Sequence, residues 1–521
     1  MDQKQEIIGN KIRRVLEVII ICAGLLTLGI LFLLGMIVTV YFVDGYTEIP
    51  YYNSKSAIPV LLLSVAAIGL YVLGRRKGIA DKINQKKLLT GLLIFAYAFG
   101  ALWIMLSHSY PVADRNNVSL AAASFLRDDY TMLEFGQYIF VYPYQLFYVA
   151  FLELCYYLVG NEYYFFPQMI NAVVVMFICY HLYRLTGELF EEEDTSGNVL
   201  LLLFGALAMF FYTTYVYGNL PGLVFSIWAL RRLTDYIKYN RLSSGIMAVI
   251  LIAIGVLFKK NFMIFLLAMA ITLFLSFLQQ KKRMYLVMIV LLFTVRALLN
   301  WGLDRYYENR SGLEIGDGQP MLASLAMGLQ EDEDAPGWHN GFDINIFIES
   351  EYDPVVTKEK AKDNIYGSLH RMKEDPLAAA GFFLKKTVTQ WCEPTYQSLW
   401  DSNCADNHTM KLSKLTQNIY SGKINGFLLL FMDVFQSLIW GLSLFCIWYR
   451  RKKLRPIQLS LVMILAGGFV FQLFWEAKAQ YNLPYMMIML PFAAGGLHDI
   501  YQAVQNRWQA EEKDHEQEQN V

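Results

Sequence analysis

Long apolar blocks separated by short polar segments restrict the fold of this sequence more than any other feature. The first block runs from Val15 to Val43, which is too long for the core of a signal peptide, and no clear small-residue cleavage site follows it. About 20 apolar residues suffice for a helix to cross a bilayer. Hydrophobic residues make up 56% of the 521 residues, above the average for soluble domains. We therefore expect an all-α polytopic membrane protein.

Twelve blocks are long and apolar enough to be read as transmembrane helices. The first two blocks are either an N-terminal addition to the other ten blocks or a single region that we have divided wrongly. The twelve are residues 15–43, 57–74, 88–106, 163–184, 197–216, 219–238, 245–258, 261–278, 284–302, 424–448, 457–475 and 481–500.

Lysine and arginine recur in every second connection, which sets an orientation. Such residues gather in short cytoplasmic loops. With a cytoplasmic N-terminus, the acidic segment 187–198 also lies inside, but acidic residues weigh little in this rule. The polar C-terminal tail, 509–521, is then cytoplasmic, and we expect it to be disordered. The basic segments that fall inside are 11–14, 75–87, 231–241, 279–283 and 449–455.

The same alternation decides two ambiguous segments. Residues 138–160 are apolar enough to span, but a span there would move every later basic loop outside. We therefore expect this tyrosine-rich segment to lie at, or dip into, the outer interface. Residues 245–278 exceed the length one span needs. Lys259, Lys260 and Asn261 are expected to break them into a hairpin whose tip points outward.

The chain then divides into five parts, with the polar elements of the outer face in the second and third. We expect mostly helical structure in the third part, because apolar positions recur there at helical spacing. The parts are an N-terminal two-span segment (1–87), a transmembrane module (88–302) with an outer loop (107–162), an extracytoplasmic segment (303–423), a three-span bundle (424–500) and a cytoplasmic tail (501–521).

Asp114 follows the third apolar block by only a few residues. It can be a solvated carboxylate that caps a helix starting near Asn116. It can also be a catalytic base, because a carboxylate positioned near an aromatic-rich interface suits proton removal from a hydroxyl. Residues 116–126 have the pattern of a short amphipathic helix, which would keep Asp114 close to the bilayer surface. Both interpretations stay open.

Three lysines are also expected at the outer face. Lys259 and Lys260 depart from the positive-inside trend, and Lys478 lies two residues from Glu476. Each can simply extend its ammonium group to the interface. Paired cations at that level can also bind a lipid phosphate.

Other chemistries have little support. The net charge of −1 gives no reason to expect nucleic acid. No cysteine or histidine spacing typical of a metal site is present, no glycine-rich phosphate loop occurs, and we expect no cofactor. Cys392 and Cys404 share one polar segment and could form a disulfide in an oxidising compartment.

Taken in order, several motifs resemble those of the GT-C superfamily, the membrane glycosyltransferases that use polyprenyl-phosphate sugars. The similarity is closer to the bacterial branch of protein O-mannosyltransferases and aminoarabinose transferases (glycosyltransferase family 39-like). It covers roughly residues 88–500. The motifs are YPVADRNNVSLAA around Asp114, YIFVYPYQLFYVAF, YGNLPG, FKKNF, MGLQEDEDAPGWHNGFD, FFLKKTVTQWCEPTY and WEAKAQYNLPY.

Two positions depart from that pattern. Asn219 stands where an acidic residue is common, which puts a metal requirement in doubt. Gln480 stands where an arginine often precedes the tyrosine of the late motif, and Lys478 could supply that charge.

The resemblance implies an inverting transfer at the outer face of a bacterial plasma membrane. Asp114 would be the base, and Lys259, Lys260 and Lys478 would bind the donor phosphate. The partners would be membrane lipids, a polyprenyl-phosphate-linked sugar and an acceptor glycan, lipid or protein. The residues implied in positioning donor or acceptor are Arg115, Tyr142, Asn219, Trp338, His339, Glu476 and Tyr481.

Two other functions fit parts of the sequence. A transporter or flippase shares the number of spans, but no repeated halves are visible. An O-antigen polymerase or ligase also uses polyprenyl-linked sugars and a large outer loop. It would rely on arginines in a late loop rather than on an early aspartate.

Overall fold

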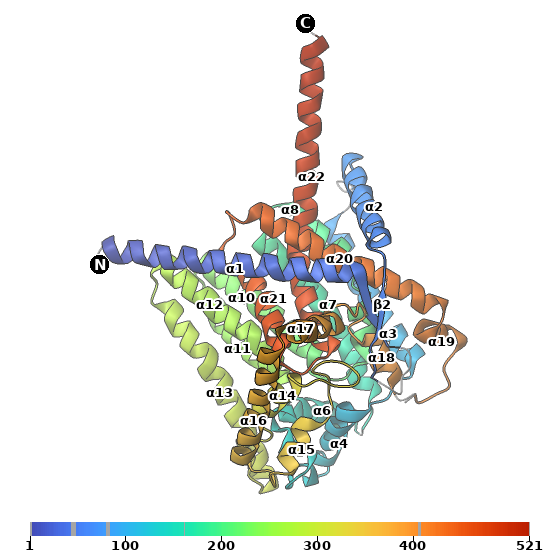
Figure 1. Ribbon diagram of the computed structural model, residues 1–521, viewed down its shortest axis with the longest axis vertical. Helices are drawn as coiled ribbons and strands as arrows, with labels where there is room; N and C mark the ends of the chain where they lie inside the picture. Colours follow the sequence, from blue (N-terminus) through green and yellow to red (C-terminus); the bar gives the residue numbers. More distant parts are fainter. Residues whose placement is uncertain (1–2, 43–47, 80–83, 161, 405–407, 520–521) are drawn as a thin grey trace.

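The computed structural model describes residues 3–42, 48–79, 84–160, 162–404 and 408–519. Its described part is almost entirely helical, and helices distant in sequence pack side by side (Figure 1). Among the described residues, eight helices are long and apolar enough to cross a membrane, or ten if each of two bent helix pairs forms one span. An all-α polytopic membrane fold is therefore confirmed. The eight lie on α1 (Gln3–Ile37), α2 (Ala57–Arg76), α3 (Gln85–Ser107), α7 (Phe165–Leu189), α12 (Met263–Gln280), α13 (Met284–Ser311), α20 (Lys423–Arg450) and α21 (Pro456–Phe474).

Three further predicted spans lie on α10 (Asn219–Tyr239), α11 (Leu242–Phe258) and α22 (Leu483–Gln519). The predicted single helix over 197–216 is wrong. Its residues form α8 (Glu193–Gly205) and then α9 (Leu207–Phe211) with a 3-10 turn, bent by 55° at the break.

The tyrosine-rich segment is also broken. Its residues form α5 (Tyr138–Val141), a 3-10 turn that begins at Pro143, and α6 (Leu146–Val159), with a bend of 100°. Proline fixes its own φ and removes a backbone donor, which favours a break at this point. The 14 residues of α6 extend about 21 Å, less than the roughly 30 Å of a bilayer core. The segment therefore does not cross as one straight helix, and its interfacial position stays a prediction.

The hairpin predicted around Lys259 is confirmed. The α11 helix ends at Phe258, and the backbone of the next residue, Lys259, is extended, with φ −154°. At the opposite ends of α11 and α12, the Lys282 Nζ atom donates to Asn240 Oδ1 over 3.3 Å. The two helices are thus antiparallel.

The connections predicted to be cytoplasmic meet at one end of the bundle, which we call the basic end (residues 75–79, 187–198, 231–241, 279–283 and 449–455). Acidic residues of 187–198 pair with the arginines that surround them. Arg231 contacts Glu188 at 2.7 Å, Arg455 contacts Glu191 at 2.8 Å and Arg450 contacts Glu192 at 2.9 Å. These ion pairs explain why an acidic segment belongs among basic loops.

The segment between α13 and α20 is mostly helical, as predicted, although α13 itself continues to Ser311. Asp375 accepts a hydrogen bond from Ala378 N at the start of α17, next to Pro376. This capping explains why α17 begins at Pro376 as a helix separate from the preceding one. The helices are α14 (Met321–Gly328), α15 (Phe342–Ile348), α16 (Pro354–Glu374), α17 (Pro376–Trp391), α18 (Ser398–Asn403) and α19 (Lys414–Ser421).

Two predictions near the chain ends are wrong. The first apolar block does not stay helical to residue 43, because Val38–Tyr41 (β1) pairs antiparallel with Tyr51–Ser54 (β2). Its β-branched residues favour a strand. The tail expected to be disordered continues α22 as a helix to Gln519 and projects from the bundle (Figure 1).

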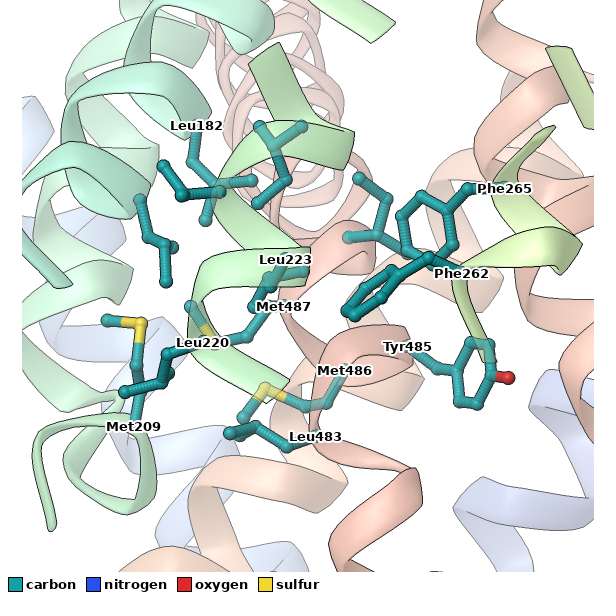
Figure 2. Close-up of a cluster of buried hydrophobic side chains, with 14 of the residues drawn as sticks. Leu182, Met209, Leu220, Leu223, Phe262, Phe265, Leu483, Tyr485, Met486 and Met487 are labelled. Carbon is teal, nitrogen blue, oxygen red and sulfur yellow. The ribbon is translucent and has the colours of Figure 1, made fainter. Parts of the chain in front are cut away.

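A cluster of buried apolar side chains joins the helices behind the site described below (Figure 2). Leu220 and Leu223 of α10 lie beside Met486 and Met487 of α22. Close packing of this kind fixes the relative positions of the helix ends that carry polar groups.

Candidate active site

The polar residues singled out from the sequence converge at the end of the bundle opposite the basic end, which we call the site end. Five segments meet there: the start of α4 (Ala113–Phe125), the α5–α6 turn, residues 215–219, the tip of the α11–α12 hairpin and residues 475–482. Lys259 lies at the centre, with its Nζ atom 4.1 Å from the centre of the Tyr217 ring and 5.5 Å from that of Tyr481.

Asp114 occupies the first turn of α4 and is exposed. Its carboxylate accepts a hydrogen bond from the side chain of Tyr138, which orients it. Ala113, directly before it, has φ +48°. This left-handed conformation is unusual for a residue with a Cβ atom, and such strain often occurs where a functional side chain must be aimed.

Arg115 points away from Asp114 into the protein. It is buried, donates from Nη1 to the carbonyl of Asp401 over 2.9 Å, and lies over the ring of Tyr215 at 5.0 Å. Burial raises the pKa of Asp401 to about 7, although the Arg115 charge acts against this rise. Arg115 therefore anchors α4 to the α18 helix.

Lys259 is the cation best placed to meet an anion. Burial lowers the pKa of its ammonium group to about 8, while Asp114 and Glu476 act in the opposite direction. Within the described ranges, no carboxylate oxygen lies within 4.0 Å of its ammonium nitrogen. The faces of the Tyr217 and Tyr481 rings stabilise the positive charge instead. Lys260 points outward and lies over Tyr144, with Nζ 4.3 Å from the ring centre.

Lys478 does have a counter-ion. Its Nζ lies 2.8 Å from Glu48 Oε2 and 3.9 Å from Glu476 Oε1. Although burial lowers the pKa of Lys478, Glu48 raises it above its usual range. Gln397 Nε2 also donates to Glu48 Oε1 over 2.8 Å. The β1–β2 connection thus contributes a carboxylate to the site end.

Glu476 links three of the predicted residues. Tyr481 donates its hydroxyl to Glu476 Oε2 over 3.0 Å, and His339 Nδ1 lies 3.8 Å from Oε1. Burial raises the pKa of Glu476, and Lys478 and His339 oppose that rise. Trp338 is buried beside this group, with its ring centre 6.2 Å from that of Phe42.

Asn219 begins α10 and lines a cavity of about 10 Å³ with Lys259, Asn261, Gln480 and Tyr481. Asn219 Oδ1 and Asn261 Nδ2 are buried and have no hydrogen-bond partner among the described residues. Tyr142 lies among the tyrosines of the α5–α6 turn, with its ring centre 5.1 Å from that of Tyr138 and 6.0 Å from that of Tyr144. The structure thus brings the predicted catalytic, phosphate-binding and positioning residues together at the site end. Arg115 and Trp338 are buried beneath its surface.

Three groups that the structure places at the site end escaped the sequence analysis: Glu48, Asp401 and the tyrosine pair Tyr215 and Tyr217. Glu48 is 430 positions from Lys478 along the chain, and no local pattern links such residues. For Tyr217 the motif YGNLPG was a usable signal, since this tyrosine opens it. Cys392 and Cys404 remain separate thiols.

Comparisons with known proteins add one family. The model of the Alg9-like mannosyltransferase family matches residues 135–312, which include Tyr142, Asn219, Lys259 and Lys260. No curated protein matches the chain.

Two solved structures are weakly similar to this chain. One is the archaeal oligosaccharyltransferase AglB from Archaeoglobus fulgidus in complex with an inhibitory peptide and a dolichol-phosphate. It has 13% identity and a TM-score of 0.43 over 81% of this chain and 52% of that chain. The apo form of the Archaeoglobus fulgidus oligosaccharyltransferase has 11% identity and a TM-score of 0.42, over 80% and 52% of the two chains. This chain thus spans about half the length of each.

The family match covers the α5–α6 turn, the start of α10 and the hairpin tip, which together supply much of the site. Together with the polytopic helical fold, the match makes this part of the chain similar to a family of mannosyltransferases.

Proposed function

We propose that the chain transfers a sugar from a polyprenyl phosphate to an acceptor hydroxyl, with inversion, at the outer face of a bacterial plasma membrane. The observation that carries this proposal is the convergence of an exposed carboxylate, Asp114, with a cation that has no ion-pair partner within the described ranges, Lys259. The outer location rests on the opposite placement of the basic end, since basic loops favour the cytoplasm. Gly9 of α1 lies against Lys281 at that basic end, in keeping with a cytoplasmic N-terminus.

In this reaction Asp114 removes the proton of the acceptor hydroxyl. The hydroxyl oxygen attacks the anomeric carbon and forms the new glycosidic bond, while the bond from that carbon to the phosphate oxygen breaks. The polyprenyl phosphate leaves with the electron pair. The hydrogen bond from Tyr138 holds the carboxylate in one orientation.

The leaving phosphate gains negative charge, and Lys259 stabilises it electrostatically. Lys260 assists from the mouth of the site. Lys478 contributes through a charge that Glu48 already balances, so its role is smaller. Tyr142, Asn219, His339, Glu476 and Tyr481 position donor or acceptor, and Arg115 and Trp338 support them from behind. The acceptor is a cell-envelope glycan, a lipid or a protein.

Purified protein tests this proposal with a panel of polyprenyl-phosphate sugars and envelope acceptors. We expect release of polyprenyl phosphate and a product of opposite anomeric configuration, which NMR can assign. A product of retained configuration would contradict the mechanism. If no donor reacts but reconstituted vesicles move a lipid or solute, the protein is a transporter.

A further inference from the structure

A large cavity lies at the basic end, far from the proposed active site. Its volume is about 710 Å³, and α2, α3, α7 and α8 form its walls. Leu70, Gly74 and Arg75 contribute from α2, Lys86 from α3, and Glu193 and Leu201 from α8. Polar groups and apolar side chains both line it, as expected for a site that receives an amphiphile.

The cavity exists because α2 packs loosely against the bundle. An added Cβ at Gly74 would meet no atom within 4 Å. Leu70 of α2 is 71% exposed, and Ile79, just beyond the end of this helix, is 53% exposed, as expected for side chains that contact lipid. We therefore expect lipid rather than water beside Leu70, where the cavity opens to the outside.

The charges around the cavity are only partly paired. Arg75 hydrogen-bonds to Asp194, and its guanidinium lies 5.1 Å from the ring centre of Tyr501. Lys86 and Glu193 also line the cavity, and neither side chain joins an ion pair within the described ranges. One cation and one anion are thus available to a ligand that carries both charges.

A second cavity lies against α2 nearer the start of this helix. Its volume is about 580 Å³, and its walls are almost wholly apolar, with Val60, Ser64 and Ile68 of α2 facing α1, α20 and α22. Residues 64, 68, 71 and 75 share one helix face, because they are spaced by three or four. From Ser64 to Arg75 the helix rises about 16 Å, close to the roughly 15 Å of one bilayer leaflet.

We infer that the two cavities hold one phospholipid with an amine-bearing headgroup. Its phosphate binds Lys86 beside Arg75, its ammonium group meets Glu193, and one acyl chain lies along α2 in the apolar cavity. The lipid fills the loose packing of α2 and fixes this helix to the bundle. This inference does not depend on the transfer reaction.

Native mass spectrometry of the full-length protein tests the site after incubation in micelles with phosphatidylethanolamine or phosphatidylglycerol. We expect about one retained phosphatidylethanolamine per chain, and Gly74→Trp should reduce retention about tenfold because the indole fills the polar cavity. Gly69→Trp is the matched control, since Gly69 also has open space around it but lines neither cavity. Equal retention by both variants would overturn the inference.

The charge pattern gives a second test, which does not require the glycine variants to fold. Lys86→Glu should weaken phosphatidylethanolamine retention about tenfold, as loss of one charge-assisted contact predicts. Lys87→Glu, one residue outside the cavity lining, should leave it unchanged. Soluble glycerophosphoethanolamine should not raise the melting temperature, whereas the lipid should. Equal effects of the headgroup alone, or stronger retention of phosphatidylglycerol, would overturn the assignment.

Discussion

The two ends of the bundle use charge in opposite ways. At the basic end, arginines pair with carboxylates: Arg450 bonds Asp499 at 2.6 Å and Glu192 at 2.9 Å, and Arg231 bonds Glu188 at 2.7 Å. At the site end, Lys259 and Lys260 lie over tyrosine rings, and Asp114 is exposed. The arginines at the basic end are thus paired within the protein, whereas Lys259 and Asp114 join no ion pair among the described residues and are, in our proposal, left for a substrate.

The largest effect on stability should come from breaking a pair at the basic end. Arg450→Gln leaves Asp499, which is only 4% exposed, without its cation. Removing one partner of a buried pair costs about 3–5 kcal/mol in the free energy of unfolding. Thermal unfolding in detergent measures this loss.

Arg451→Gln is the matched control, because Arg451 is exposed just after α20 and its guanidinium bonds to and lies over Trp448, with no ion pair among the described residues. We expect it to change stability little. Transfer per folded molecule should be normal in both variants. An Arg450 variant of ordinary stability would show that the basic end is not held together by its ion pairs.

Removing a cation at the site end should instead affect the reaction. Lys259→Met should lower kcat/KM for the donor about 10- to 100-fold, because the phosphate loses a partly desolvated charge partner. Folding should be nearly unchanged, since Lys259 closes no ion pair in the described structure. Steady-state kinetics with varied donor measures the effect.

Lys260→Met provides the comparison at the neighbouring, exposed position, where solvent weakens the charge. Its effect should be a few-fold. If Lys260→Met caused the greater loss, the phosphate site would lie at the mouth and not at Lys259.

The same cation predicts a pH dependence. Because burial lowers the pKa of Lys259 to about 8, the charged form present at lower pH disappears as the pH rises through that value. The kcat/KM for the donor should therefore fall above about pH 8. The negatively charged phosphodiester of the bound donor favours the charged lysine, so kcat at saturating donor should fall only at higher pH. In the Lys259→Met variant this alkaline loss should vanish, and its persistence would assign it to another group.

The smallest effect should come from Glu48→Gln, which removes the counter-ion of Lys478. The freed ammonium group should then bind the donor phosphate more strongly and lower KM about two- to fivefold, the scale of a partly exposed ion pair. Glu349→Gln is a control, since Glu349 lies 3.9 Å from Lys360 in an exposed pair. A higher KM in the Glu48 variant would mean that the pair positions Lys478 for the donor.

Patterns along the chain predicted much of the fold and only part of the site. Charge alternation placed the break at Lys259, because the rule acts on each short loop separately. The same local information missed the β1–β2 hairpin, since Val38–Tyr41 continues an apolar run without a boundary. Local patterns predicted that Lys478 is available to the donor phosphate, because the pairing with Glu48 joins residues far apart in the chain. The buried contact of Arg115 with Asp401 was hidden for the same reason.

The most direct test of the central claim is a comparison of wild type with Asp114→Asn in single-turnover transfer, with donor binding measured on the same preparations. A base that acts only in the chemical step should give a fall in rate of about 10²- to 10⁴-fold with unchanged donor affinity. Asp129→Asn, which changes an exposed carboxylate of the same loop that accepts hydrogen bonds from Thr131, should react normally. Ordinary turnover by Asp114→Asn, or a loss explained entirely by weaker donor binding, would contradict the account.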